Sequence, residues 1–234
     1  MDFSVFSGPA FWVALLSIII ANILLSGDNA VVIALASRNL PAHQQKKAIF
    51  WGSAAAIVLR VVLTITAVQL LTLPYLKIIG AILLIYIGVQ LLADSDDDAN
   101  MEGSSNIWGA IRTILVADLV MSLDNVLAVA AAAQKGPEET RLALLIIGLG
   151  LSIPLIIFGS TMLLKVMDRF PVIITLGAGL LGLLAGGMLV EDPAIKESMQ
   201  AAFEDAHMIF EGIGVAIVIL LGTYLKKKNA SKEA

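Results

Sequence analysis

The stretch that decides the fold is Asn22-Ile-Leu-Leu-Ser-Gly-Asp-Asn-Ala30, and the chain carries a second copy of it, Asp118-Leu-Val-Met-Ser-Leu-Asp-Asn-Val126. Each copy lies inside a long apolar segment. A carboxylate at the centre of a membrane costs at least roughly 2.5–3.5 kcal/mol, so two copies of Ser-x-Asp-Asn need a reason to be there. The doubled motif therefore predicts a binding or transport site inside a membrane bundle.

The composition of the whole chain places it in the same class. Hydrophobic residues make up 59% of the sequence and charged residues 15%, and the mean hydropathy is +0.92, values typical of a polytopic membrane protein. The absence of cysteine excludes disulfides, thiolate nucleophiles and sulfur ligands for metals. The expected surroundings are a lipid bilayer, with no nucleic-acid partner, and any metal must be held by oxygen or imidazole.

Hydropathy and the polar breaks predict an all-α fold with seven transmembrane helices. The lengths suit a hydrocarbon core about 30 Å thick. We expect the first span to remain in the mature protein, because no basic residue precedes it and the polar motif interrupts it. The expected spans are 11–36, 48–70, 75–92, 109–133, 141–164, 171–190 and 209–225.

The basic residues predict an orientation with the N-terminus outside and the C-terminus inside, since lysine and arginine near span ends are retained in the cytoplasm. Only four basic residues near span ends then lie outside: Lys77, Lys135, Arg141 and Lys196. The cytoplasmic set is larger: Arg38, Lys46, Lys47, Arg112, Lys165, Arg169 and Lys226 to Lys228.

The duplication extends past the motif, because Gly52 and Gly148 stand at the same spacing and Ile79-Gly-Ala corresponds to Leu176-Gly-Ala. Three spans are an odd number, so the second copy must enter the membrane in the opposite sense, as in the 3+3 inverted repeat of secondary transporters. The expected divisions are a first repeat (1–93), an acidic cytoplasmic linker (94–108), a second repeat (109–190), an external amphipathic helix (191–208), and a seventh span with a basic tail (209–234).

Helix phase predicts that the first span is broken. On an ideal helix Asp28 points about 120° away from the stripe that holds Ser26 and Asn29, so a regular helix would split the polar set. Gly27 lowers the cost of unwinding at this place. Because Leu123 replaces this glycine in the second copy, we expect a milder break there, or none.

The motif residues supply only oxygen ligands, which suit Mn²⁺, Mg²⁺ or Ca²⁺ as a transported substrate rather than a resident cofactor. Without the ion, carboxylates packed together would take up protons, so exchange of metal for protons follows as a coupling hypothesis. Arg60, within a span, is expected to serve as their counter-ion or to close a gate. The candidate metal residues are Ser26, Asp28, Asn29, Asp118, Ser122, Asp124 and Asn125.

These two motifs resemble the signature of the TerC family of integral membrane proteins, particularly its short bacterial branch, and the resemblance covers nearly the whole chain. It implies seven spans and the inverted repeat of the wider LysE-type exporter group. It also implies manganese export across the bacterial cytoplasmic membrane, a role in supplying metal to secreted proteins and their secretion machinery, and an association with tellurite resistance. By position, it assigns metal-site roles to Asp28, Asn29, Asp118, Asp124 and Asn125. Gly27 and Asn22 depart from the pattern of the second repeat.

Several alternatives stay open. Asp118 is either a direct ligand or a group that orients Asn125. His207 and Glu211 are one helical turn apart and could bind metal at the outer mouth, or form a solvated interfacial pair.

Two other function classes compete with a transporter. The first is a non-transporting assembly or metal-supply factor for secreted proteins, in which the buried polar residues hold the bundle together. The second is an intramembrane aspartyl protease, which the sequence disfavours because Leu25 or Met121 stands where the leading glycine of Gly-x-Gly-Asp would fall. We therefore expect no enzymatic activity.

Overall fold

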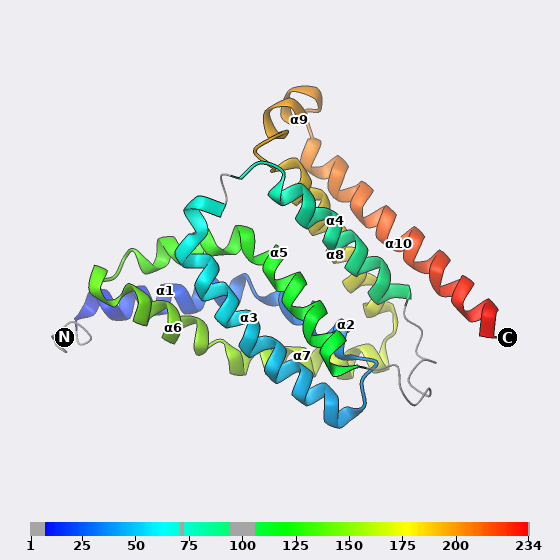
Figure 1. The fold of residues 1–234 in the computed structure, drawn as a ribbon, viewed down its shortest axis with the longest axis horizontal. Helices are drawn as coiled ribbons and strands as arrows, with labels where there is room; N and C mark the ends of the chain where they lie inside the picture. Colours follow the sequence, from blue (N-terminus) through cyan, green and yellow to red (C-terminus); the bar gives the residue numbers. More distant parts are fainter. Residues whose placement is uncertain (1–7, 71–72, 94–105, 234) are drawn as a thin grey trace.

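The computed structural model describes residues 8–70, 73–93 and 106–233, without the side chains of Leu24, Asp124 and residues 67–70 and 232–233. Every regular element in these ranges is a helix (Figure 1). Five helices are long and apolar enough to cross a membrane, or up to seven segments if each of two bent pairs is counted as one span. The all-helical membrane fold is therefore confirmed. The acidic run expected within 94–108 falls mostly outside the described residues.

The first half of the chain folds into four helices. They are α1 (Pro9–Leu24), α2 (Gly27–Ser37), α3 (Ala42–Leu70) and α4 (Leu76–Ala93). Proline begins α1, where its missing N–H would have no helical acceptor in any case.

The second half follows with α5 (Ile107–Ala133), a short 3-10 turn η3 (Glu138–Thr140), α6 (Arg141–Gly150), α7 (Ile153–Arg169) and α8 (Val172–Val190). The chain ends in α9 (Lys196–Ala202) and α10 (Ala206–Glu233). The segment 191–208 was expected to form one amphipathic helix on the membrane. In the structure it contains the short helix α9 and the start of α10, which therefore begins earlier than the expected seventh span.

The predicted break in the first span is confirmed. Helix α1 ends at Leu24, α2 begins at Gly27, and the two are bent by 49°. For the second copy, the absence of a break in the helix is confirmed, since α5 is continuous, but a milder distortion is not: α5 bends by 65° between Ile107–Leu123 and Asn125–Ala133. Leu123 does not prevent the bend, because the polar residues that follow it make contacts across the bundle.

The span expected at 141–164 is also interrupted. Helix α6 ends at Gly150 and α7 begins at Ile153, with Pro154 in its first turn. The proline cannot donate a backbone hydrogen bond to the preceding turn, so the helix restarts here. Helices α6 and α7 still count together as one of the five candidate spans, Glu138–Arg169, so this span and the bent first span each consist of two half-helices.

The helices form two groups that Figure 1 separates clearly. Helices α4, α8 and α10 pack on one another at the upper right, while α3 packs on α5, α1 on α6, and α2 on α7. A Cβ on Gly182 or Gly186 would collide with the α10 backbone at Gly214 or Phe210. These two glycines therefore allow α8 and α10 to pack closely within the bundle.

Candidate cation site

Arg60 occupies the centre of a buried polar cluster where α1, α3 and α5 meet. Only 1% of its surface is exposed. Its Nη2 donates to Asp118 Oδ1 at 2.5 Å, its Nη1 to Asn22 Oδ1 at 2.6 Å, and its Nε to Ser122 Oγ at 3.0 Å. The guanidinium thus has a partner on each of its three nitrogens, as a charge excluded from water requires.

The two copies of the motif make corresponding contacts around this arginine. Ser26 Oγ donates to Asn22 Oδ1 at 3.4 Å, and Ser122 Oγ donates to Asp118 Oδ2 at 3.2 Å, one helical turn apart in each case. The first copy of the motif has Asn22 where the second has Asp118. One carboxylate therefore faces the arginine, where two aspartates would have placed two. This substitution keeps the described cluster electrically balanced.

Asp118 is engaged by Arg60 and Ser122, and no described contact joins it to Asn125. Asn125 Nδ2 instead donates to the backbone carbonyl of Leu25 at 3.2 Å. Asn29 Nδ2 donates to the same carbonyl at 3.3 Å. The break between α1 and α2 frees this carbonyl, and it joins the amides of both motif copies.

The side-chain oxygen of Asn29 has no hydrogen-bond partner among the described residues, although Asn29 is only 3% exposed. Buried amide oxygens are almost always hydrogen-bonded, so a group outside the protein is the natural partner of this one. The neighbouring Asp28 is half-buried in the first turn of α2 and accepts a hydrogen bond from the Asn29 backbone at 2.8 Å. The positive end of the α2 dipole favours negative charge at this place.

The structure thus gathers six of the seven predicted metal residues, together with Arg60, in two adjacent groups. Ser26, Ser122, Asp118 and Arg60 share the first group, with Asn22 as a member that the predicted ligand list omitted. Asn29 and Asn125 meet at Leu25, with Asp28 beside them, and the charges of Arg60 and Asp118 both act on Asp28. The side chain of Asp124 is outside the described residues. Within the part of the chain that the structure describes, no three acidic or histidine side chains come together to hold a metal.

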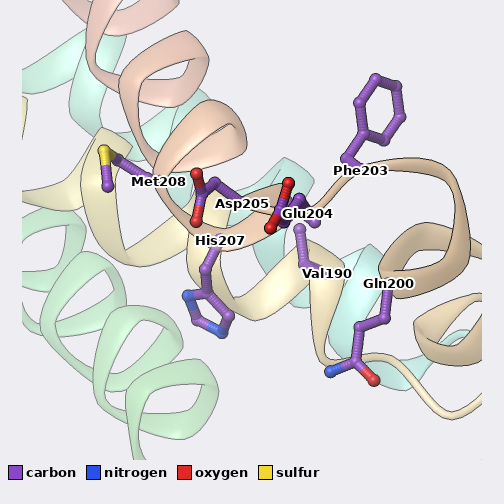
Figure 2. Close-up of a pocket in the computed structure, with 8 residues that line it drawn as sticks. Val190, Gln200, Phe203, Glu204, Asp205, His207 and Met208 are labelled. Carbon is purple, nitrogen blue, oxygen red and sulfur yellow. The ribbon is translucent and has the colours of Figure 1, made fainter.

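His207 and Glu211 lie far from this cluster, where α10 begins. His207 Nδ1 lies 3.1 Å from Glu211 Oε1, and its Nε2 lies 3.2 Å from Glu191 Oε1. His207 also borders a hollow of about 250 Å³ between α9 and α10, which Figure 2 shows with Gln200 and Phe203 at its rim. Because each imidazole nitrogen already faces a carboxylate, the pair is part of a polar bridge between α8 and α10.

Two acidic residues, Glu191 and Asp192, follow α8, and Asp192 stands where it could cap the helix that comes after it in the chain. Asp192 is fully buried and instead caps α4, accepting hydrogen bonds from the backbone N–H groups of Tyr75, Lys77 and Ile78, and from that of Ala194. Burial opposes its ionisation, but these hydrogen bonds prevail and lower the pKa of Asp192. A cap that reaches another helix leaves no signal in the local sequence.

Glu191 connects the cap to the histidine bridge. Its Oε2 accepts a hydrogen bond from Lys77 Nζ at 3.0 Å. Burial works against the charged carboxylate, but the bonds from Lys77 and His207 outweigh it and lower the pKa of Glu191.

Comparison with known proteins agrees with these observations. The model of the family described as "Integral membrane protein TerC family" matches residues 7–230. The chain is 41% identical over 217 residues to the membrane protein YjbE of Bacillus subtilis, a match that covers 93% of this chain and 97% of that one. It is 29% identical to YkoY (89% and 60% covered) and 24% identical to YceF (98% and 88% covered), both membrane proteins of the same organism. No solved structure matches the chain.

Proposed function

We propose that this chain, which belongs to the TerC family of integral membrane proteins, is a transporter that carries a hard divalent cation, Mn²⁺, out of the cytosol. The observation that carries the proposal is the buried side-chain oxygen of Asn29, which stands beside Asp28 and has no partner in the part of the chain that the structure describes. Broken helices that expose backbone and side-chain oxygens inside the membrane are the usual cation sites of secondary transporters. In this proposal Asp28, Asn29, Asp124 and Asn125 contact the ion.

Arg60 and Asp118 act in this proposal as a fixed pair of opposite charges. Because Asp118 is neutralised by Arg60 at 2.5 Å, it contributes little net charge to the site. The pair, together with Ser26 and Ser122, holds α1, α3 and α5 in place around the ligands. This assigns Asp118 a supporting role rather than direct ligation.

Exchange for protons is the simplest coupling for such a site. When a divalent ion leaves, the carboxylates that held it carry uncompensated negative charge in a low-dielectric environment. Protons that bind to Asp28 and Asp124 would replace part of the lost positive charge. Outward movement of Mn²⁺ would then accompany inward movement of protons.

The proposal includes the 3+3 inverted repeat, for which the neighbour pattern gives support. Helices α1 and α2 pack on α6 and α7, as α5 packs on α3, and α4 packs on α8. Exchanging the two repeats reproduces this set of contacts. Rocking of one repeat against the other would expose the central site to each side of the membrane in turn.

The proposed location is the bacterial cytoplasmic membrane, with the N-terminus outside and the C-terminus inside. The three consecutive lysines Lys226 to Lys228 near the end of α10 support this orientation, because such clusters are retained on the cytoplasmic side. Basic residues at the α2–α3 turn would face the same compartment.

Flux of manganese into inverted vesicles, with and without an imposed pH gradient, tests the proposal. The informative variant is Asp28→Asn, which keeps the shape of the side chain and its bond to the Asn29 backbone but removes the charge. We expect it to reduce flux at least about tenfold, the equivalent of losing 1.4 kcal/mol of transition-state stabilisation. Unchanged flux in Asp28→Asn and in Asp124→Asn would contradict the site assignment.

One competing function is a non-transporting factor that helps secreted proteins assemble. The three hydrogen bonds that Arg60 donates favour it, since the same contacts would hold a bundle together with no cargo. The abundance of Asp28→Asn in the membrane separates the two. A transporter site predicts normal abundance with lost flux, whereas a scaffold predicts reduced abundance.

A further inference from the structure

The two faces of the membrane bundle differ in how tightly the half-helices pack. Helices α1 and α6 are the halves on one side of the polar cluster, and α2 and α7 are the halves on the other (Figure 1). A Cβ built on Gly148 of α6 would lie 2.6 Å from Ile18 Cγ2 of α1. No side chain fits there, so the α1–α6 seam is closed.

The α2–α7 seam has room for a methyl group at one point, next to Ala30. A Cβ built on Gly159 of α7 would meet only the Cβ of Ala30 on α2, at 3.8 Å, and one built on Gly27 would meet nothing within 4 Å. Asn29 and Ser160 are the neighbours in sequence of Ala30 and Gly159. Both are therefore held at the same depth, near the centre of this seam.

Unpartnered polar atoms mark the same side. In the described part of the chain, three buried hydroxyls lack a hydrogen-bond partner: Ser37 at the end of α2, Ser53 on α3 and Ser160 on α7. These helices pack on one another. Hydroxyls elsewhere are paired, since Thr64 donates to the Arg60 carbonyl at 2.7 Å and Ser152 to the Gly148 carbonyl at 3.3 Å.

The three serines form a series that leads away from the cation site. Ser37 lies eight residues after Asn29 on α2, about 12 Å further along the helix at 1.5 Å per residue. Ser53 lies seven residues before Arg60 on α3, which places it about 10 Å closer to the α2–α3 turn along the helix. All three serines are at most 1% exposed. A buried hydroxyl needs a hydrogen-bond partner, and where the protein supplies none, water or an ion takes that place.

We propose that the cation reaches the site along the α2–α7 seam, from the face where α2 and α10 end, past Ser37, Ser53 and Ser160 to Asn29. This inference rests on the proposed function and adds the route. The hydroxyl oxygens replace part of the water shell of a hard divalent ion as it moves inward. The closed α1–α6 seam blocks the opposite face in this conformation.

Cysteine labelling tests the route directly, because the chain contains no cysteine of its own. Ser160→Cys and Ser37→Cys are treated with a membrane-impermeant methanethiosulfonate in right-side-out and inverted vesicles. Ser152→Cys is the matched control, a buried serine whose hydroxyl is already paired. Lys228→Cys, exposed near the end of α10, reports which face the reagent meets.

We expect Ser160→Cys and Ser37→Cys to react about tenfold faster than Ser152→Cys, and from the same face as Lys228→Cys, since only a hydrated thiol forms the reactive thiolate. The attached group should also stop Mn²⁺ flux. Equal protection of all three buried cysteines, reaction from the opposite face, or full flux after labelling would each overturn the route.

Two features keep the test decisive. If Ser160→Cys fails to accumulate as a monodisperse protein, Ser37→Cys decides alone, because it lies at a helix end. If the parent protein moves no Mn²⁺, the proposed function fails, while labelling still reports whether the hydrated seam exists.

Discussion

Asn29 and Asn125, which hold the same place in the two copies of the motif, donate their side-chain amides to one backbone carbonyl, that of Leu25, at 3.3 and 3.2 Å. The shared acceptor lies in the break between α1 and α2. It joins the bend of α5 to the broken first span, so a change in one is transmitted to the other. The two asparagines differ, because the side-chain oxygen of Asn29 is buried and has no hydrogen-bond partner among the described residues.

Asn29→Ala should weaken Mn²⁺ binding about tenfold, or 1.4 kcal/mol, because it removes the unpartnered oxygen as a ligand. The measurement is the Mn²⁺ concentration that gives half-maximal flux, or calorimetric titration in detergent. Asn229→Ala, at an exposed position near the C-terminus, is the control and should leave both values unchanged. An unaltered affinity in Asn29→Ala would remove this residue from the site.

Arg60→Met should destabilise the protein by about 3–5 kcal/mol, because it leaves the Asp118 carboxylate buried without its partner. Asp118→Asn should also destabilise the fold, since it leaves the arginine uncompensated. The double variant should lose much less than the sum of the two. Thermal unfolding in detergent measures all four proteins of this cycle, and strict additivity would show that the ion pair does not couple them.

Asp192→Asn should lower the free energy of unfolding by about 1–3 kcal/mol at neutral pH, because the amide NH2 that replaces one carboxylate oxygen cannot accept the two backbone N–H groups bonded to that oxygen. The pKa of Asp192 is lowered in the folded state, so its contribution is complete above the unfolded value near 4 and is lost as the pH falls through the folded value. The parent and the variant should therefore converge in stability below about pH 4. Unfolding curves from pH 3 to 7 measure this, and a constant difference across the range would contradict the assignment.

Gly186→Ala should separate α8 from α10, because its Cβ would collide with the backbone carbonyl of Phe210 rather than with a flexible side chain. Overpacking of this kind typically costs about 1–3 kcal/mol. Gly212→Ala is the matched control, since a Cβ there meets nothing within 4 Å. Melting temperatures in detergent should fall for Gly186→Ala and stay unchanged or rise for Gly212→Ala; an equal response of both would disprove the close contact.

The sequence was sufficient for the membrane class, the approximate ends of the helices and the break at Ser26-Gly-Asp28, since these depend on local hydropathy and backbone freedom. It was insufficient at Asp124, where a milder break or none was expected and the helix bends by 65°. The amide of Asn125 bonds to Leu25, a hundred residues earlier in the chain, and no local pattern reports that contact. The interruption between Gly150 and Ile153 was missed for a different reason: Pro154 follows an apolar run that hydropathy alone reads as one span.

The sequence by itself determined that this chain lives in a membrane, that its polar motif occurs twice and that only oxygen ligands are available there. The tertiary structure alone decided that Arg60 pairs with Asp118, that Asp192 caps α4, and that α1 and α6 meet without free space at Gly148 while α2 and α7 leave room for a methyl group at Gly159. The physical reason is that the lipid selects apolar spans residue by residue. Hydrogen bonds and close contacts between helices depend on distances that exist only after the spans have packed together.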